Sequence, residues 1–355
     1  MLLFADGMQH YNSLIYKWTS AFAAHISSTG GRSAPQCLEI IEGGSAGKTL
    51  PLASTIFVGW ALLLNEAEGL GNGTLYSASA IALDGGFVTL ASLSTEPDGT
   101  LSVFAETPAG NLAGNTNGMS GPMFVTKPGV YYYIELEIAF SGNPIGITAT
   151  LKVNTQILLN GVTANTVVAP DTLICQAAQV NYHNFGAGGA ASAYVCDLYI
   201  NDNTTVSGQP LASSFRGDIQ VGPYIVPAVD QVTDWSGYPG IPPSYAIVNQ
   251  VPPPGDSSYL YDANIGDYDT FSFTPVGAFV GEIQAAHYCL FMRKDNEGTR
   301  VVKPIVGNDV SELTAAYLSD EYYYYTYPMD VDPTTGAVWT VAGINAQVFG
   351  MKVYA

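Results

Sequence analysis

Apolar and polar residues alternate strictly in two neighbouring runs near the middle of the chain. The first run is YYYIELEIAF at 131–140 and the second is ITATLKVN at 147–154. A period of two over eight residues is typical of a β-strand with one buried and one exposed face. The six residues between the runs, SGNPIG, contain two glycines and a proline, which suit the loop of a hairpin.

The hairpin's register follows from the same pattern. If Phe140 lies opposite Ile147, then Leu136 lies opposite Leu151, and every apolar residue of both strands falls on one face. In that register Glu135 lies opposite Lys152. The hairpin is therefore predicted to form the middle of an antiparallel sheet.

Further short apolar runs lie on both sides of the hairpin, separated by clusters of Gly, Pro, Asn and Asp. Strands at this close spacing are typical of a sandwich or jelly roll. The predicted strands lie at 37–42, 55–64, 75–83, 87–94, 100–106, 172–182 and 193–201.

The amino-acid composition changes in the last third of the chain. Residues 229–258 are dense in Pro, Gly and Ser, which predicts a linker or a long surface connection. A second group of strand-like runs then continues to the end. We therefore predict an all-β chain with a jelly-roll sandwich at 1–228, a connection at 229–258 and a second, smaller β-sandwich domain at 259–355.

Composition narrows the classes of function. The 355 residues include 11 Lys and Arg against 30 Asp and Glu, a net charge of −19. A negative field of that size repels phosphate backbones, so nucleic-acid binding is not expected. Only 12% of residues are charged, while 38 are Gly and 21 are Pro, which favours a structural or adhesive β protein. The opening MLLFADGMQHY has no basic segment, so we expect neither a signal peptide nor membrane insertion.

The four cysteines are scattered at 37, 175, 196 and 289 without metal-type clustering. Buried free thiols are the expected state, and a Cys175–Cys196 disulfide between neighbouring strands is the alternative. Synthesis in a reducing cytoplasm without export is the simpler reading.

Several segments stand out together along the chain: FADGMQHY, KWTS, FVGWALLL, YIELEIAF, ATLKVN, AYVCDLYIND, FRGDIQV and GDYDTFSF, with MRKDNEGTR, VDPTTGAVWT and FGMKV near the C-terminus. In this order they resemble a family of tailed-bacteriophage structural proteins that carry a concanavalin A-like, laminin-G-like lectin domain. The resemblance implies this sandwich at the N-terminus and a role in the virion, and it brings no catalytic residues.

Glu135 and Glu137 are the strongest candidates for catalytic residues, because a spacing of two puts both carboxylates on one strand face. Concanavalin A-like glycanases place an acid and a nucleophile or base in this way. Their E-x-D-x-x-E pattern is not met here, since Glu137 replaces the Asp and Phe140 the last Glu. Lys152 opposite Glu135 favours a solvated ion pair and an ionised carboxylate. We predict no catalytic residues and no enzymatic activity.

Two further groups of side chains are candidates for binding. Asp262, Asn264, Asp267 and Asp269 offer oxygen atoms at calcium-loop spacing, although β-turns use the same residues. No cofactor is predicted, and calcium at these four residues is the alternative. Tyrosines on a strand show rings on both faces, which suits a protein interface, stacking on a glycan or ordinary packing. The tyrosines concerned are Tyr322, Tyr323, Tyr324, Tyr325 and Tyr327.

The predicted function is therefore a non-enzymatic virion structural protein on the particle exterior. It would be a tail fibre, a tail-associated adhesin, a capsid decoration or a head fibre, made in the bacterial cytoplasm and located in the virion. Expected partners are other virion proteins and further copies of the chain, with a host surface glycan as an additional candidate. The alternative is a secreted glycan-binding module or glycanase on a concanavalin A-like fold.

Overall fold

The computed structural model of the chain divides into two compact units. The N-terminal unit comprises Met1–Gln9, Ser13–Thr205 and Pro210–Gly222, and the C-terminal unit comprises His10–Asn12, Val206–Gln209 and Pro223–Ala355. Among the described residues no helix has the length and apolar character needed to cross a membrane. The structure describes residues 1–32, 35–64, 73–81, 87–95, 101–105, 127, 129–141, 146–165, 176–184, 192–222, 227–240, 244–277, 281–307 and 311–355.

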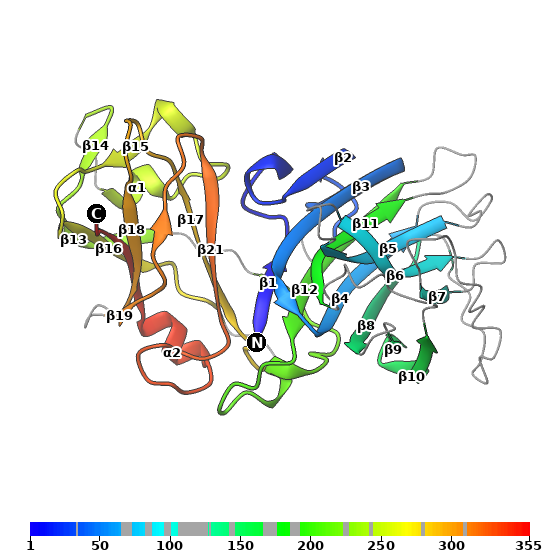
Figure 1. Cartoon of the computed structure of the whole chain (residues 1–355). Helices are drawn as coiled ribbons and strands as arrows, with labels where there is room; N and C mark the ends of the chain where they lie inside the picture. The colour runs from blue at the N-terminus through cyan, green and yellow to red at the C-terminus, as the bar shows by residue number, and fades with distance from the viewer. Residues whose placement is uncertain are drawn as a thin grey trace. The chain divides into compact units, whose positions relative to one another are not determined.

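Strands make up 55% of the described residues and helices 8%, which confirms the predicted all-β class. The N-terminal unit holds one antiparallel sheet with the order β10-β9-β8-β4-β12-β3-β11-β5-β6-β7, on which β1 pairs with β12 and β2 with β3 (Figure 1). Its strands are β1 (Leu2–Asp6), β2 (Ser20–Ser27), β3 (Cys37–Ala53), β4 (Thr55–Leu64), β5 (Gly73–Ile81), β6 (Phe87–Thr95), β7 (Leu101–Ala105), β8 (Tyr131–Ser141), β9 (Gly146–Val153), β10 (Gln156–Asn165), β11 (Ala177–Asn184) and β12 (Ala193–Asp202).

The hairpin predicted from the alternating pattern is β8 and β9, and its register is confirmed. Phe140 pairs with Ile147, Leu136 with Leu151, and Glu135 with Lys152. The tip of its loop, 142–145, lies outside the described residues. On its other side β8 pairs with β4, which places the hairpin inside the sheet rather than at its edge.

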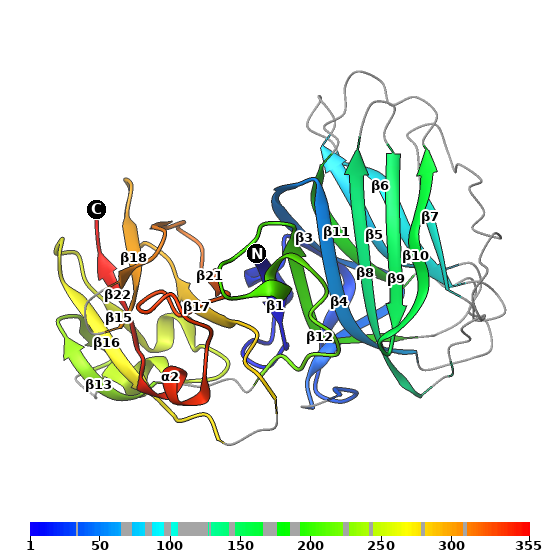
Figure 2. The same cartoon turned by 90° about the horizontal axis from the view of Figure 1, so that it is seen from below.

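The long strand β3 folds this sheet into the two layers of a jelly-roll sandwich. Its first half pairs with β12 and its second half with β11, so the chain passes from one layer to the other along a single strand. Figure 2 shows β4, β8, β9 and β10 in one layer and β5, β6, β7 and β11 in the other. Trp60 on β4 meets Tyr182 on β11 edge-to-face at 5.5 Å, and both rings are fully buried. The core therefore lies between the layers, as the predicted jelly roll requires.

The C-terminal unit is a smaller β-sandwich, as predicted. Its six-stranded sheet packs against the pair β17–β21 through a core centred on Phe271, Leu290, Val302 and Met351. Its strands are β13 (Pro227–Thr233), β14 (Ser236–Tyr238), β15 (Tyr259–Tyr261), β16 (Tyr268–Phe273), β17 (Ala286–Met292), β18 (Val301–Val306), β19 (Ser311–Glu312), β20 (Ala316–Tyr317), β21 (Tyr323–Met329) and β22 (Val348–Val353). The helices of the chain are the short segments η1 (Leu14–Tyr16), η2 (Pro210–Ser213), α1 (Ser244–Val248), η3 (Gly255–Ser257) and α2 (Val341–Ala346).

The stretch 229–258, predicted to be a connection, contains ordered elements that pack onto the C-terminal unit. The Asp230 carboxylate accepts hydrogen bonds from the backbone N–H groups of Ser244 and Tyr245, at 2.9 and 2.7 Å. These bonds satisfy two of the free N–H groups that begin α1. Trp235 and Tyr245 then pack on the core around Phe271.

Candidate functional site

Glu135 occupies a buried position instead of the solvated one that the sequence predicts. Its side chain is 2% exposed. Glu135 Oε1 accepts a hydrogen bond from the Tyr199 hydroxyl at 2.6 Å and another from the Gly217 backbone N–H at 2.7 Å. The predicted solvated ion pair with Lys152 is therefore wrong, because Glu135 is buried. Its hydrogen-bond partners are distant in the sequence, so no local pattern reveals them. The Lys152 ammonium lies 4.0 Å from the centre of the Phe215 ring.

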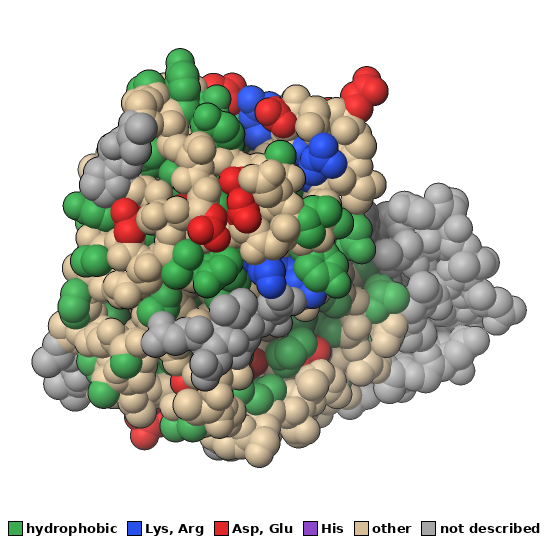
Figure 3. All heavy atoms as spheres, turned by 90° about the vertical axis from the view of Figure 1, so that its left-hand side faces the viewer, with side chains coloured by type: hydrophobic (Ala, Val, Ile, Leu, Met, Phe, Trp, Pro, Cys, Tyr) green, Lys and Arg blue, Asp and Glu red, His purple; other side chains and the backbone are tan. Residues whose placement is uncertain are grey.

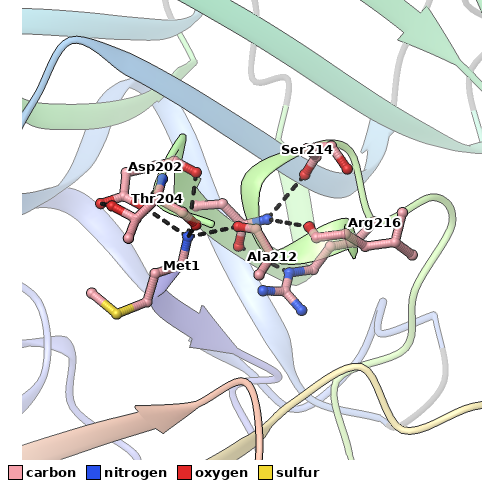
Figure 4. Close-up of polar contacts among 8 residues, drawn as sticks. Met1, Asp202, Thr204, Ala212, Ser214 and Arg216 are labelled. Carbon is pink, nitrogen blue, oxygen red and sulfur yellow. Dashed lines mark hydrogen bonds and ion pairs between the residues drawn. The ribbon is translucent and has the colours of Figure 1, made fainter. Parts of the chain in front are cut away.

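The segment 210–222 covers this face of the sandwich and is fixed to β12. Asn201 Nδ2 donates to the carbonyl groups of Leu211 and Ser214, and Arg216 Nε donates to Asn201 Oδ1 at 2.9 Å (Figure 4). The Met1 ammonium bonds Asp202 beside this network. Arg216 is itself buried. Glu135 thus holds the covering segment in place and is removed from solvent.

The predicted tyrosine group is divided between the two faces of β21. Tyr324 is buried and donates to the His10 carbonyl at 3.0 Å, whereas Tyr325 and Tyr327 pack against the core around Phe271. Tyr322 and Tyr323 are half-buried, and Tyr322 stacks on Phe291 at 4.8 Å. Roles of this group at an interface or on a glycan stay predictions.

The predicted calcium residues do not converge on one point. Asp262 Oδ1 accepts from the Asn264 backbone N–H at 2.6 Å, and Asn264 Nδ2 donates to Asp267, which is the hydrogen bonding of a turn. Asp269 instead accepts from the Trp235 backbone N–H at 2.9 Å, and burial raises the pKa of its carboxyl to about 6. Within the described part of the chain, no group of three His, Cys, Asp or Glu side chains could hold a metal ion.

A different surface gathers uncharged polar side chains on three neighbouring strands of the N-terminal unit. On β11, Gln179, Asn181 and His183 alternate with the buried Val180 and Tyr182, so they point away from the core. Residues directly opposite on paired antiparallel strands share a face. That rule adds residues of β3 and β2, and we call the set the polar face: Ser20, Phe22, Ser45, Thr49, Gln179, Asn181 and His183.

The register arranges the polar face in rows across the strands. Phe22, Ser45 and His183 form one row, and Thr49 pairs with Gln179 in another. The Phe22 ring is 71% exposed, which is unusual for a side chain of its size. The polar face therefore combines one exposed aromatic ring with hydroxyl, amide and imidazole groups.

Gly47 lies at the centre of the polar face and allows its polar groups to converge. It pairs with Ser20 on one side and with Asn181 on the other. A Cβ atom at this position would collide with Asn181 Oδ1 and lie 2.5 Å from Ser20 Oγ and 3.3 Å from Gln179 Nε2. Only the missing side chain of glycine leaves room for these three groups to approach one another above the strand.

His183 contributes a neutral imidazole to the polar face. Burial lowers the pKa of the imidazole to about 4, because a charged ring would lose hydration there. At neutral pH the ring therefore carries one N–H donor and one nitrogen acceptor.

Sequence reasoning did not identify the polar face. Its one local signal is the alternation of polar residues at 179, 181 and 183 with apolar ones. The rows depend on strand pairs far apart in the sequence, such as Gly47 with Asn181.

Comparison with known proteins shows similarity in fold alone. About half of the chain resembles "Cellulose induced protein, Cip1", with TM-score 0.39, 15% identity and coverage of 52% of this chain and 90% of that one. Alginate lyase Aly36B gives TM-score 0.35 and 14% identity over 51% of this chain and 86% of its own. Alginate lyase vAL-1 from Chlorella virus gives TM-score 0.36 and 12% identity over 52% of this chain and 93% of its own. No family model and no curated protein matches the chain.

Two predictions from the sequence are contradicted by these comparisons. The chain was expected to be a non-enzymatic structural protein of a virus particle, whereas the similar structures include alginate lyases and a Trypanosoma rangeli sialidase. The expectation that it is not an enzyme is corrected with it. The resemblance to bacteriophage proteins, the predicted partners and the predicted location stay untested.

Proposed function

We propose that the N-terminal unit binds a glycan chain across the polar face. The observation that carries the proposal is the convergence of uncharged donors and acceptors from three strands around Gly47, beside the exposed ring of Phe22. Each sugar hydroxyl both donates and accepts hydrogen bonds, and amide, hydroxyl and neutral imidazole groups match that pattern. An aromatic ring offers the apolar surface on which a sugar ring stacks.

The electrostatics of the site favour a glycan over a ligand with many phosphate groups. The seven side chains of the polar face are neutral at pH 7, since burial keeps His183 unprotonated. The formal charge of the whole chain is −19. A phosphate-rich ligand would meet a repulsive field and no compensating cation among these side chains.

Binding measurements on purified protein test the proposal. A glycan panel would identify a ligand, and titration calorimetry would compare wild type with Asn181→Ala. Loss of one or two hydrogen bonds is expected to weaken binding by about 3–10-fold each. Gln231→Ala is the matched control, because this amide is exposed in the C-terminal unit and bonds Ser272 Oγ at 3.0 Å. Equal affinity of wild type and Asn181→Ala for every ligand found would contradict the proposal.

Cleavage of the bound glycan is a second candidate function, favoured by His183. A neutral imidazole can take a proton from the carbon beside a sugar carboxylate. A C=C bond then forms as the neighbouring glycosidic C–O bond breaks, and the leaving sugar oxygen takes up the proton that the imidazolium returns. Asn181 and Gln179 stand on the same strand face and offer amide N–H groups to that carboxylate. A pKa of about 4 makes His183 a weak base, so slow turnover is expected.

The ultraviolet absorbance of an unsaturated sugar product distinguishes cleavage from binding alone. Turnover by wild type that His183→Gln abolishes, with binding retained, would establish the lyase function. Release of reducing ends without an unsaturated product would indicate hydrolysis and exclude elimination. Binding without either product would leave the polar face as a binding site.

A further inference from the structure

Two cysteines lie opposite each other on paired strands of the N-terminal unit. Val195 on β12 pairs with Leu38 on β3 in antiparallel register, and continuing that register by one residue brings Cys196 opposite Cys37. Both thiols are buried, with exposures of 3% and 0%. The disulfide considered from the sequence was Cys175–Cys196, and Cys175 lies outside the described residues.

The backbone spacing of this pair suits a disulfide. Opposite residues in an antiparallel ladder have Cα atoms about 4.5 or 5.5 Å apart. Disulfides span Cα separations of about 4.4–6.8 Å. Two cysteines facing each other in register can therefore be joined without moving the strands. The two thiols are close enough for each to shift the pKa of the other.

The groups around the two sulfur atoms differ. Cys37 Sγ donates to the Thr29 carbonyl at 3.1 Å, and the Tyr131 hydroxyl lies 3.4 Å from Cys196 Sγ. The neighbouring Cys37 thiol lowers the pKa of Cys196 against the effect of burial, and the Tyr131 hydroxyl and the Arg32 backbone N–H lower it further. The neighbouring Cys196 thiol and burial raise the pKa of Cys37. Cys196 is therefore the thiol that ionises first and attacks first.

We propose that Cys37 and Cys196 are a modification site at which a small disulfide oxidant joins β3 to β12. The Cys196 thiolate attacks one sulfur of the oxidant, for example glutathione disulfide, and releases one glutathione thiolate. The Cys37 thiolate then attacks the Cys196 sulfur of the mixed disulfide and releases the second glutathione. The protein loses two electrons and two protons, and the oxidant becomes two thiols.

Burial sets when the bond forms and how long it lasts. A thiol without solvent exposure meets the oxidant while the chain folds or when the strands open, and reacts slowly in the folded protein. The bond closes a loop from residue 37 to residue 196, which contains Gly47 and Asn181 of the polar face. A cross-link over so long a loop restricts the unfolded chain strongly. This modification is independent of glycan binding.

Disulfide mapping of the full chain tests the proposal. The protein is refolded with glutathione disulfide, its free thiols are alkylated, and unreduced digests are analysed by mass spectrometry. A linked Cys37–Cys196 peptide is expected, together with a melting temperature roughly 5–15 °C above that of the reduced protein. Cys37→Ser and Cys196→Ser should each abolish that difference, whereas Cys289→Ser, the matched control in the C-terminal unit, should keep it.

Alkylation of both cysteines after oxidative refolding would overturn the proposal, as would a linkage of either one to Cys175. The mapping uses wild-type protein, so it decides the question even if a serine variant fails to fold.

Discussion

Replacement of Tyr199 by Phe should destabilise the N-terminal unit although it removes a single oxygen atom. The Tyr199 ring is fully buried, and its hydroxyl donates to Glu135 at 2.6 Å while accepting from the Arg216 backbone N–H at 3.0 Å. Burial raises the pKa of Tyr199 well above its usual value, and the negative charge of the nearby Glu135 carboxylate is the second-largest cause. The hydroxyl therefore remains a donor throughout the stable pH range.

The magnitude follows from the two bonds lost. A hydrogen bond to a charged group contributes about 1.5–3 kcal/mol, and a buried N–H left without its partner costs about 1–3 kcal/mol. Because the two effects overlap, the expected loss is about 2–4 kcal/mol in the free energy of unfolding. For a unit of this size that corresponds to a fall of roughly 5–15 °C in melting temperature.

Urea unfolding followed by circular dichroism measures this loss, with Tyr261→Phe as the control. Tyr261 is 53% exposed in the C-terminal unit, so removal of its hydroxyl should change stability by less than about 0.5 kcal/mol. An equally small change for Tyr199→Phe would refute the assignment of Glu135 to a buried network.

Three further predictions concern the polar face and two buried titrating groups. Gly47→Ala should abolish glycan binding while the protein remains folded, because the added Cβ displaces Asn181 and Ser20; calorimetry and circular dichroism together measure this. The His183 pKa of about 4 lies below its unfolded value near 6.5, so the unfolded chain binds a proton before the folded protein does. The free energy of unfolding therefore falls as pH drops from about 6.5 to 4, by up to about 3 kcal/mol. His183→Gln should flatten that slope in unfolding experiments. Asp269 behaves oppositely, since its raised pKa of about 6 means that stability falls as pH rises from about 4 to 6, and Asp269→Asn should remove this fall.

Local features of the structure could be predicted where a single strand pair determines them. The alternation in 131–154 is enough to predict the register, because a slip by one residue would expose every apolar side chain of the hairpin. The partners of Glu135 could not be predicted in this way. Tyr199 and Gly217 lie 64 and 82 residues after Glu135 in the sequence, and no periodic pattern connects either of them to it.

The same reason explains why the polar face was missed. Ser20, Gly47 and Asn181 become neighbours because β3 pairs with β2 on one side and with β11 on the other. Composition misled the interpretation of 229–258, where proline and glycine suggested a connection. The Asp230 carboxylate binds the first N–H groups of α1, and this contact depends on the folded unit rather than on composition.

A crystal structure of the protein with its tightest-binding oligosaccharide tests glycan binding most directly. We expect a sugar ring against Phe22 and sugar hydroxyls hydrogen-bonded to Asn181, Gln179 and His183. The strongest competing location is the stacked pair Tyr238 and Tyr259 of the C-terminal unit, whose ring centres lie 5.2 Å apart, with Tyr238 47% exposed. Figure 3 shows apolar side chains interspersed with polar ones on the face that it presents. An oligosaccharide bound at those tyrosines, with the polar face empty, would contradict the proposed function.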